Sequence, residues 1–400
     1  MTTQALGSPG PGEVLALFRA RPPLTRADVM RVTGLSRSTV NQRIDLLLEA
    51  GLLAEREPDV VPGRGRGRPA GSFALDVDRG VLLVCDIGAT AMRAAACDLS
   101  GRILTETTLR SDVTEGPLEV LPRVESMFAA LLETVGRART EVHGLALSVP
   151  GPVDHEQATV ISPPIMSGWD QFDVRGWFAT DYRCPLLLEK DATAMAWGEY
   201  RTHYPDADTI VLLKLGTGVG SGIISHGRIH RGADGAAGDI GHTQLLDPSP
   251  TNAPLCRCGN LGCVEARAGG WAMMRDLAAE GREVDTVDGV VQLVRTSDPV
   301  AVRLARAAGR VLGLALSEMV NIVNPRVVVV DGQLAEAEEQ IFAGLREMVY
   351  SRSLPLATRR LELRRGRLDG RAASVGLALL LSDHIFDPTR IDLQLSEASA

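Results

Sequence analysis

VLLVCDIGATAMRAAACDLSGRIL, residues 81–104, decides the fold of this chain, because its pattern returns in TIVLLKLGTGVGSGIISHGRIH, residues 209–230. Each stretch predicts a strand, a turn of small residues, a second strand, another turn and a third strand. Gly88 in the first small-residue turn corresponds to Gly216 in the second, about 128 residues later. A repeat of this length predicts two similar α/β halves.

The residues around the two repeats predict sheets covered by helices. Helical stretches run from Leu118 to Arg137 and from Val302 to Val323, and an apolar strand runs from Val327 to Gly332. Apolar strands mixed with helices of this length are typical of α/β domains whose sheets are covered by helices.

The glycine turns of the repeats are candidate phosphate-binding loops. Such turns leave backbone N–H groups bare, and two facing turns can hold the phosphates of a nucleotide from both sides. Asp86 stands where it could reach a metal ion bound to such a phosphate. The alternative is a pair of tight hairpins that need glycine only for a positive φ. The candidate nucleotide-phosphate residues are Asp86, Gly88, Thr90, Gly216, Thr217, Gly218 and Gly332.

The first fifty residues predict a helix-turn-helix. Thr25 with Asp28 forms a capping-box pattern at the start of one helix, and Gly34 supplies a tight turn after it. Ser36 can cap the next helix, which is the one that enters the major groove of DNA in this motif. The alternative is a small packing domain that never meets DNA. The residues expected to face DNA are Ser36, Arg37, Ser38, Thr39, Asn41, Gln42 and Arg43.

A β-hairpin wing is predicted directly after these helices. Its strands are residues 52–56 and 72–75, and the intervening PGRGRGRPAG carries Arg64, Arg66 and Arg68. Glycines let a backbone approach the narrow minor groove, whose negative potential attracts arginine. The alternative is a flexible linker with solubilising arginines. Because the stretch follows a helix-turn-helix, the wing interpretation is preferred.

Three cysteines within eight residues indicate a metal site. Cys256, Cys258 and Cys263 supply three soft ligands, and structural zinc prefers four. His242 is the best fourth ligand by sequence distance, whereas Glu265 is better placed to orient a ligand or face a substrate. The alternative is three buried thiols without a metal ion. The remaining cysteines, Cys85, Cys97 and Cys184, are expected in the core.

Length and charge limit the number of domains and the classes of partner. A chain of 400 residues with 45% hydrophobic residues is long enough for two or three domains. No run of eighteen apolar residues and no signal-peptide pattern is present, so we expect a cytoplasmic protein without a membrane partner. The net charge is −8, yet residues 1–76 hold ten arginines against eight acidic residues. The acidity therefore belongs to the larger, C-terminal part.

At this point the chain resembles the ROK family of repressors, open reading frames and sugar kinases. The resemblance covers essentially the whole length. It rests on DIGAT, SVPGPVD (148–154), GWD (168–170), EKDATA (189–194), LGTGVGSG, GAAGDIGH (235–242), the cysteine cluster and VNPRVVVVDG. It implies an α/β, bilobal, actin-like sugar-kinase fold with duplicated βββαβα halves. The expected organisation is a winged helix-turn-helix in residues 1–76, a first lobe in 77–193 rejoined by 381–400, and a second, zinc-binding lobe in 194–380.

The resemblance also implies roles for single residues. Asp191 matches the carboxylate that takes the proton from the sugar hydroxyl in the family's kinases, and His242 matches a residue that binds both zinc and sugar. Glu265 and Asp239 match sugar-binding carboxylates, which suit a ligand with many hydroxyls. The expected effector-binding residues are Gly168, Lys190, Asp191, Asp239, His242 and Glu265.

Three departures from the family's pattern weaken the case for catalysis. Ala89 replaces a second glycine, and its methyl group would crowd a phosphate. Lys190 replaces asparagine, and could either pair with Asp191 or attract an anionic ligand. Asp239 replaces glutamate and retracts its oxygens from the sugar.

Three functions follow, in order of preference. The first is a transcriptional regulator, a homodimer or homotetramer, that binds double-stranded operator DNA and is controlled by a sugar or sugar-phosphate effector. The second is an active ATP-dependent sugar kinase with a DNA-binding appendage, in which Asp191 is catalytic. The third is a constitutive DNA-binding protein with a vestigial cleft. Zinc is the expected cofactor, and ATP with Mg²⁺ stays open.

Overall fold

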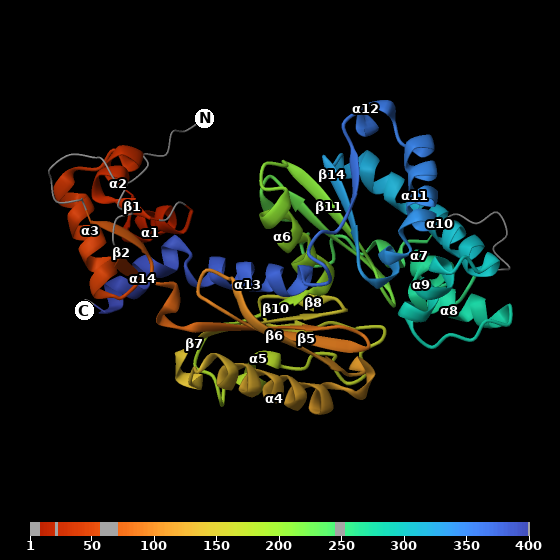
Figure 1. The fold of residues 1–400 in the computed structure, drawn as a ribbon, viewed down its shortest axis with the longest axis horizontal. Coiled ribbons are helices and arrows are strands. Elements are labelled where there is room, and N and C mark those ends of the chain that lie inside the picture. Colours follow the sequence, from red (N-terminus) through yellow and green to blue (C-terminus); the bar gives the residue numbers. More distant parts are fainter. Residues whose placement is uncertain (1–8, 21–22, 57–70, 245–252, 399–400) are drawn as a thin grey trace.

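The structure is a computed structural model that describes residues 9–20, 23–56, 71–244 and 253–398. Figure 1 shows a small N-terminal domain at one end, a first lobe in the middle and a second lobe at the other end. Among the described residues, no helix has both the length and the apolarity needed to cross a bilayer.

The N-terminal domain is a winged helix. Its helices are α1 (Pro11–Ala20), α2 (Arg26–Thr33) and α3 (Arg37–Glu49), and its sheet has the order β1 (Leu24–Thr25), β3 (Ser72–Leu75), β2 (Leu53–Arg56). The capping box of Thr25 and Asp28 is present, and Gly34 is left-handed with a φ of 70°. Ser36 caps α3 by accepting a hydrogen bond from the Thr39 N–H. The sequence predictions for these helix ends are therefore confirmed.

Each lobe is built on a five-stranded sheet with the same strand order. The first sheet runs β10 (Leu186–Lys190), β7 (Val142–Val149), β4 (Val81–Ile87), β5 (Ala91–Cys97), β6 (Ile103–Arg110). The second runs β15 (Glu362–Arg365), β14 (Val327–Asp331), β11 (Thr209–Leu215), β12 (Val219–Ser225), β13 (Arg228–Ile229). In both, the repeated stretch supplies three antiparallel strands and the others are parallel additions. The predicted duplication is confirmed.

The two halves exchange their last helices. Helix α6 (Asp191–His203) follows the first sheet in the chain but packs on β11 and β12, whereas α13 (Ala372–Ile385) follows the second sheet but packs on β4 and β7. The two helices cross at close range, because a Cβ at Gly376 would lie 1.8 Å from the Ala194 carbonyl oxygen. This crossing joins the two lobes, and Figure 1 shows α6 and α13 next to each other between them.

Other helices cover the outer faces of the sheets. Helix α4 (Pro117–Val135) covers the first sheet, and α10 (Pro299–Val323) packs with α11 (Glu338–Arg352) over the second. Helix α10 begins earlier than the sequence predicts, because Asp298 caps it and Pro299 fits its first turn. The remaining elements are α5 (Val174–Phe178), α7 (Val264–Ala268), α8 (Gly270–Ala279), α9 (Val287–Arg295), α12 (Pro355–Thr358), α14 (Pro388–Ala398), β8 (Val153–Asp154) and β9 (Thr159–Val160).

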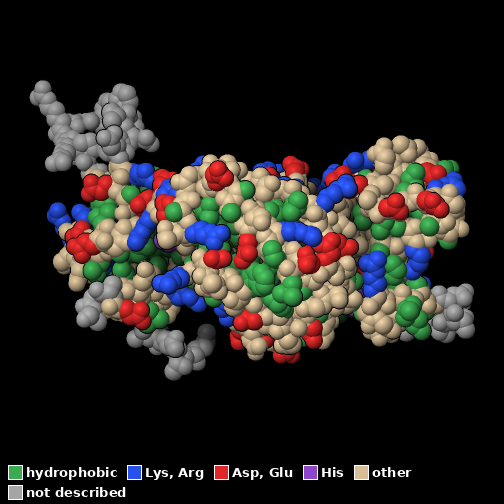
Figure 2. Space-filling view, turned by 90° about the horizontal axis from the view of Figure 1, so that it is seen from below, with side chains coloured by type: hydrophobic (Ala, Val, Ile, Leu, Met, Phe, Trp, Pro, Cys, Tyr) green, Lys and Arg blue, Asp and Glu red, His purple; other side chains and the backbone are tan. Residues whose placement is uncertain are grey.

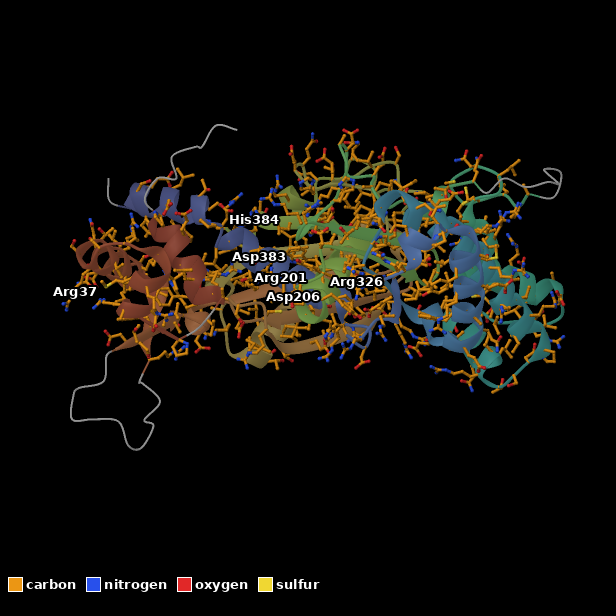
Figure 3. All side chains as sticks on the ribbon, turned by 90° about the horizontal axis from the view of Figure 1, so that it is seen from above. Arg37, Arg201, Asp206, Arg326, Asp383 and His384 are labelled. Carbon is orange, nitrogen blue, oxygen red and sulfur yellow. The ribbon has the colours of Figure 1, made fainter. Side chains whose placement is uncertain are left out.

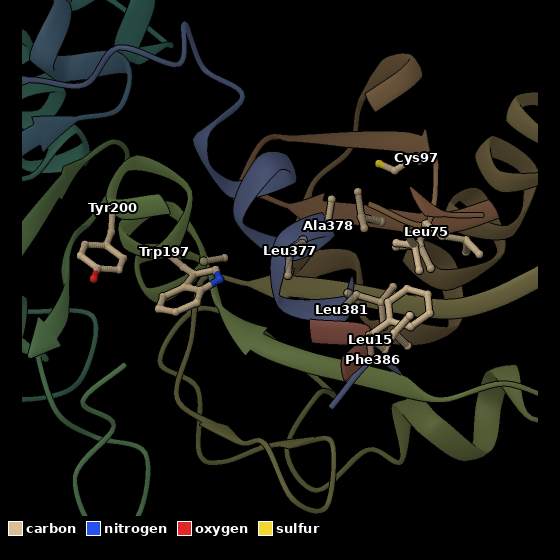
Figure 4. Packing of buried hydrophobic residues seen from close by; sticks show 14 of the residues in the cluster. Leu15, Leu75, Cys97, Trp197, Tyr200, Leu377, Ala378, Leu381 and Phe386 are labelled. Atoms are coloured by element: carbon tan, nitrogen blue, oxygen red, sulfur yellow. The ribbon is translucent and has the colours of Figure 1, made fainter. Parts of the chain in front are cut away.

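The winged helix shares one apolar core with the lobes. Figure 4 shows Leu15 of α1 beside Phe386 and Leu381, and the same cluster continues through Leu377 to Trp197 of α6. Of the described residues after 380, those of α13 belong to a helix that packs on β4 and β7 of the first lobe, whereas α14 packs against α1 of the winged helix.

The outer surface is charged without a dominant sign on the face seen in Figure 2, where acidic and basic side chains alternate over both lobes. Ion pairs of the second lobe include Arg306 with Glu347 and Arg303 with Glu280. Mixed charges of this kind keep a surface hydrated but define no binding site.

Candidate functional site

A cleft of about 560 Å³ lies between the two sheets. Both small-residue turns line it, and all seven residues that were expected near phosphates meet there: Asp86, Gly88, Thr90, Gly216, Thr217, Gly218 and Gly332. Of the expected effector residues, Lys190, Asp191, Asp239, His242 and Glu265 line the same cleft. Gly168 is not among the lining residues; it occupies a left-handed turn with a φ of 76°.

Asp191 stands at the start of α6 with both carboxylate oxygens already engaged. Its Oδ1 accepts a hydrogen bond from the Ala192 N–H at 2.5 Å, and its Oδ2 pairs with the ammonium group of Lys214. The sequence left open whether Lys190 pairs with Asp191, and the structure does not bear out that alternative. Lys190 instead donates to Asp239 at 3.2 Å, because its side chain leaves the end of β10 toward the second lobe.

The charges in the cleft act strongly on one another. Burial alone would lower the pKa of Lys214, but the carboxylates of Asp191 and Asp86 outweigh it and raise that pKa. Burial raises the pKa of Asp86, and the charge of Lys214 opposes that rise. Burial likewise raises the pKa of Asp331 at the end of β14. Lys214 is therefore held as a cation among carboxylates.

Glu265 connects the cysteine loop to the second small-residue turn. It lies in the first turn of α7, two residues after Cys263, and is buried. Its Oε2 accepts a hydrogen bond from the Val219 N–H at 3.0 Å, and its Oε1 accepts one from the Trp271 indole at 3.2 Å. Gly218 leaves the room for this contact, because a Cβ there would meet Oε2 at 2.4 Å. One face of the cleft is thus fixed to the cysteine loop.

The four residues expected to bind zinc come together. The ligand atoms of His242, Cys256, Cys258 and Cys263 all lie within 4.8 Å of one another. The Cys258 and Cys263 sulfurs are 3.7 Å apart, and a tetrahedral zinc with Zn–S bonds of about 2.3 Å places its sulfurs about 3.8 Å apart. Three thiols and an imidazole in this geometry fit a structural zinc ion.

The candidate DNA interface lies at the far end of the winged helix. Figure 3 shows Arg37 projecting from that end, away from the lobes. Ser36, Ser38 and Gln42 are exposed beside it, and Thr39, Asn41 and Arg43 are partly exposed. The hydroxyls of Ser36 and Thr39 contact each other at 2.8 Å at the start of α3. Arg64, Arg66 and Arg68 fall outside the described residues.

A junction that the sequence did not reveal ties the winged helix to the lobes. Asp383 of α13 binds Arg19 of α1 through Oδ1 at 2.8 Å, and its Oδ2 pairs with Arg201 of α6. Figure 3 labels Arg201 and Asp383 where the two lobes meet the N-terminal domain. The guanidinium of Arg19 also lies over the ring of Phe386, 5.4 Å from its centre. Three elements far apart in the sequence therefore meet at one carboxylate, and no local pattern predicts such a contact.

Lys214 was not among the predicted site residues, although its position in the repeat indicates it. It is the single cation in an otherwise apolar strand, two residues before Gly216, as Asp86 stands two residues before Gly88. The repeat therefore places the two side chains at corresponding positions of facing hairpins.

Comparison with known proteins gives two family matches. The ROK family profile matches residues 82–384, and a MarR family profile matches residues 12–65. The chain is 26% identical over 372 residues to the xylose repressor of Bacillus subtilis, covering 91% of this chain and 92% of that one. It is similar in structure to a ROK family transcriptional regulator described as a homologue of the Escherichia coli MLC protein, with a TM-score of 0.80, 24% identity and coverage of 97% and 98%. A ROK glucokinase from Streptomyces griseus, solved with glucose and AMPPNP, gives a TM-score of 0.64 and 27% identity, and covers 76% of this chain and 99% of its own.

Proposed function

The chain belongs to the ROK family, and on this premise we propose that it is a transcriptional repressor controlled by a sugar or sugar-phosphate effector in the interlobe cleft. The xylose repressor supports this function because it matches both the winged helix and the lobes of this chain in one alignment. The residues proposed to face DNA are those of α3, with Arg37 at its exposed start. Two such helices are needed for an inverted-repeat operator, so the proposal includes a homodimer or homotetramer.

One observation carries the proposal, the course of helix α13. At its start, Ala372 and Ala373 line the cleft, and near its end Asp383 binds Arg19 of the winged helix. A helix of 14 residues spans about 20 Å as a rigid rod. A change in the closure of the cleft therefore has a direct route to the DNA-binding domain. The sugar and the DNA favour different closures of the cleft in this proposal. The coupling free energy is the change in DNA affinity that sugar binding then causes.

The cleft offers the hydrogen-bonding groups that a sugar requires. Asp191, Asp239 and Glu265 present acceptors for hydroxyl protons, and Lys190 presents a donor. Every hydroxyl that loses water in the cleft must regain a partner, so such a set favours a polyhydroxylated ligand over an apolar one. A zinc ion on His242 and the three cysteines would hold the loop that carries Glu265, as a structural ion and not as a reactant.

A thermal-shift screen with the full-length protein tests the effector half of this proposal. The panel holds neutral pentoses and hexoses and their phosphates. We expect at least one sugar to raise the Tm, by an amount that grows with its concentration, since a ligand that binds only the folded state stabilises it. If no member of the panel moves the Tm, a constitutive DNA-binding protein becomes the better account.

The DNA half is tested with fragments that the full-length protein selects from genomic DNA. Arg37→Ala should weaken binding to them by roughly 5- to 100-fold, the range for one lost arginine contact to DNA. Arg228→Ala removes the same charge from an exposed position in β13 and should leave the affinity unchanged. Equal effects of the two variants would argue against α3 as the DNA-reading helix.

An ATP-dependent sugar kinase is the second candidate, favoured by Asp191 at the start of α6 inside the cleft. Release of ADP in the presence of each sugar of the panel separates the two candidates. Turnover of about 1 per second or faster would support the kinase. A sugar that raises the Tm without ADP release supports the repressor.

A further inference from the structure

Lys214 in the second hairpin stands at the position that Asp86 holds in the first. Asp86 pairs in register with Ser148 across β4 and β7, and Lys214 pairs in register with Asp331 across β11 and β14. All four strands therefore end at the cleft, which Asp86, Lys214 and Asp331 line together with Asp191. The two repeats thus bring Asp86 and Lys214 into the cleft from facing sheets, and Asp331 and Asp191 line it beside Lys214.

The ammonium group is bound within this cluster and is not a mobile surface charge. The Lys214 side chain is 23% exposed and that of its partner Asp191 only 5%. Asp86 and Asp331 are near enough that their charges, with that of Asp191, outweigh the effect of burial on Lys214. An ammonium group offers three donors from a compact charge, so it can serve several carboxylates at once.

Carboxylates gathered in a cleft of this kind otherwise bind a hard divalent cation. Mg²⁺ takes oxygen ligands from one or two carboxylates together with phosphate oxygens. In this chain Asp191 is already paired with the ammonium group of Lys214, and the strand register places Lys214 beside Asp331, so the residues present do not fit a nucleotide-bound Mg²⁺ among these carboxylates.

We propose that the ammonium group of Lys214 takes the place of a divalent cation among Asp86, Asp191 and Asp331, so that the cleft binds its ligand without metal. Lys214 is thus a specificity-determining residue of the cleft. It also engages Asp191, whose other oxygen accepts from the Ala192 N–H. A sugar hydroxyl approaching Asp191 must share Oδ2 with the ammonium group, which suits binding better than proton removal.

Binding of Mn²⁺, followed by electron paramagnetic resonance on the full-length protein, tests this assignment directly. Lys214→Met keeps an unbranched side chain one heavy atom shorter and removes its charge, and Lys214→Arg keeps the charge. We expect Lys214→Met to bind about one Mn²⁺ at least tenfold more tightly than the wild-type protein, and Lys214→Arg to behave like the wild type. The double variant Lys214→Met/Asp191→Asn should lose the gain, which separates this site from the cysteine cluster. Tight, Asp191-dependent Mn²⁺ binding by the wild-type protein would overturn the proposal.

A second measurement needs no variant and covers the case in which Lys214→Met fails to fold. The sugar that raises the Tm is titrated with and without millimolar Mg²⁺. We expect its Kd to change less than about twofold, whereas a tenfold gain in affinity with Mg²⁺ would overturn the proposal. This arm rests on the proposed sugar-binding function. The Mn²⁺ measurement does not, so the failure of one idea can be told from the failure of the other.

Discussion

The two hairpins that face each other across the cleft share a backbone and differ in charge. In each, a buried central strand ends one residue before the glycine of the turn, and its last but one residue is Asp86 in one half and Lys214 in the other. The sheets keep the same strand order and the halves exchange equivalent helices. The difference shows that duplication preserved what backbone geometry requires, whereas single side chains determine what the cleft can bind.

The cysteine loop is a large difference between the halves, because it belongs to the second half only, and its removal should have the largest effect. Cys258→Ala should abolish zinc binding, since a structural site with three ligands loses most of its affinity. Glu265 lies two residues after Cys263, so the response of the Tm to sugar should fall as well. Metal content by mass spectrometry and the thermal shift measure both effects. Cys184→Ala, in the first lobe, is the matched control and should keep one zinc.

The opposite charges of the two halves should respond unequally to neutralisation. Lys214→Met leaves Asp191 buried without its cation, at a cost of about 3 kcal/mol or a fall in Tm of roughly 3–5 °C for a chain of this length. Asp86→Asn should cost less than about 1 kcal/mol, because burial already raises the pKa of Asp86 and disfavours its charge. Thermal denaturation at neutral pH compares the two variants, and similar losses of Tm would mean that the charges do not play different roles.

The junction at Asp383 can be weakened without changing a residue that lines the cleft. Asp383→Asn weakens the contacts of α13 with Arg19 and Arg201 together. We expect the sugar to raise the Tm as before, while its effect on DNA affinity falls several-fold, since the lost contacts lie between the two sites. Asp206→Asn changes an exposed carboxylate in the turn after α6 and is the control (Figure 3). An equal effect of the sugar on DNA affinity in both variants would show that Asp383 does not connect the two sites.

The smallest expected change in stability concerns Glu199, a buried carboxyl group of α6. The buried residues of α13 include no such group. Burial raises the pKa of Glu199 to about 6, although the N–H groups of Arg367 and Leu368 oppose that rise. A carboxyl group with a raised pKa in the folded state favours folding at low pH, and this contribution is lost as the pH rises through about 6. Glu199→Gln should remove that dependence. The Tm of the variant minus that of the wild type should therefore increase between about pH 5 and about pH 7, and a constant difference would contradict this.

The sequence predicts the local features of this molecule well and its long-range contacts poorly. The capping box at Thr25, the paired turns at Gly88 and Gly216 and the ligands around Cys256 depend on short spacings or on a repeat, which a single sequence displays. The exchange of α6 and α13 depends on which sheet each helix covers, and no short spacing in the sequence displays that choice. The same limit explains why Lys190 was considered as the partner of Asp191 when Lys214, on another strand, is the one that pairs.

The central claim is that occupation of the cleft changes the affinity of the winged helix for DNA. The direct measurement is the Kd of the full-length protein for a fragment that it selects from genomic DNA, taken with and without a saturating sugar that raises its Tm. The account predicts a change of roughly 5- to 150-fold, the usual range for coupled sites, and a much smaller one for Asp383→Asn. An unchanged Kd in the presence of a sugar that demonstrably binds would contradict it.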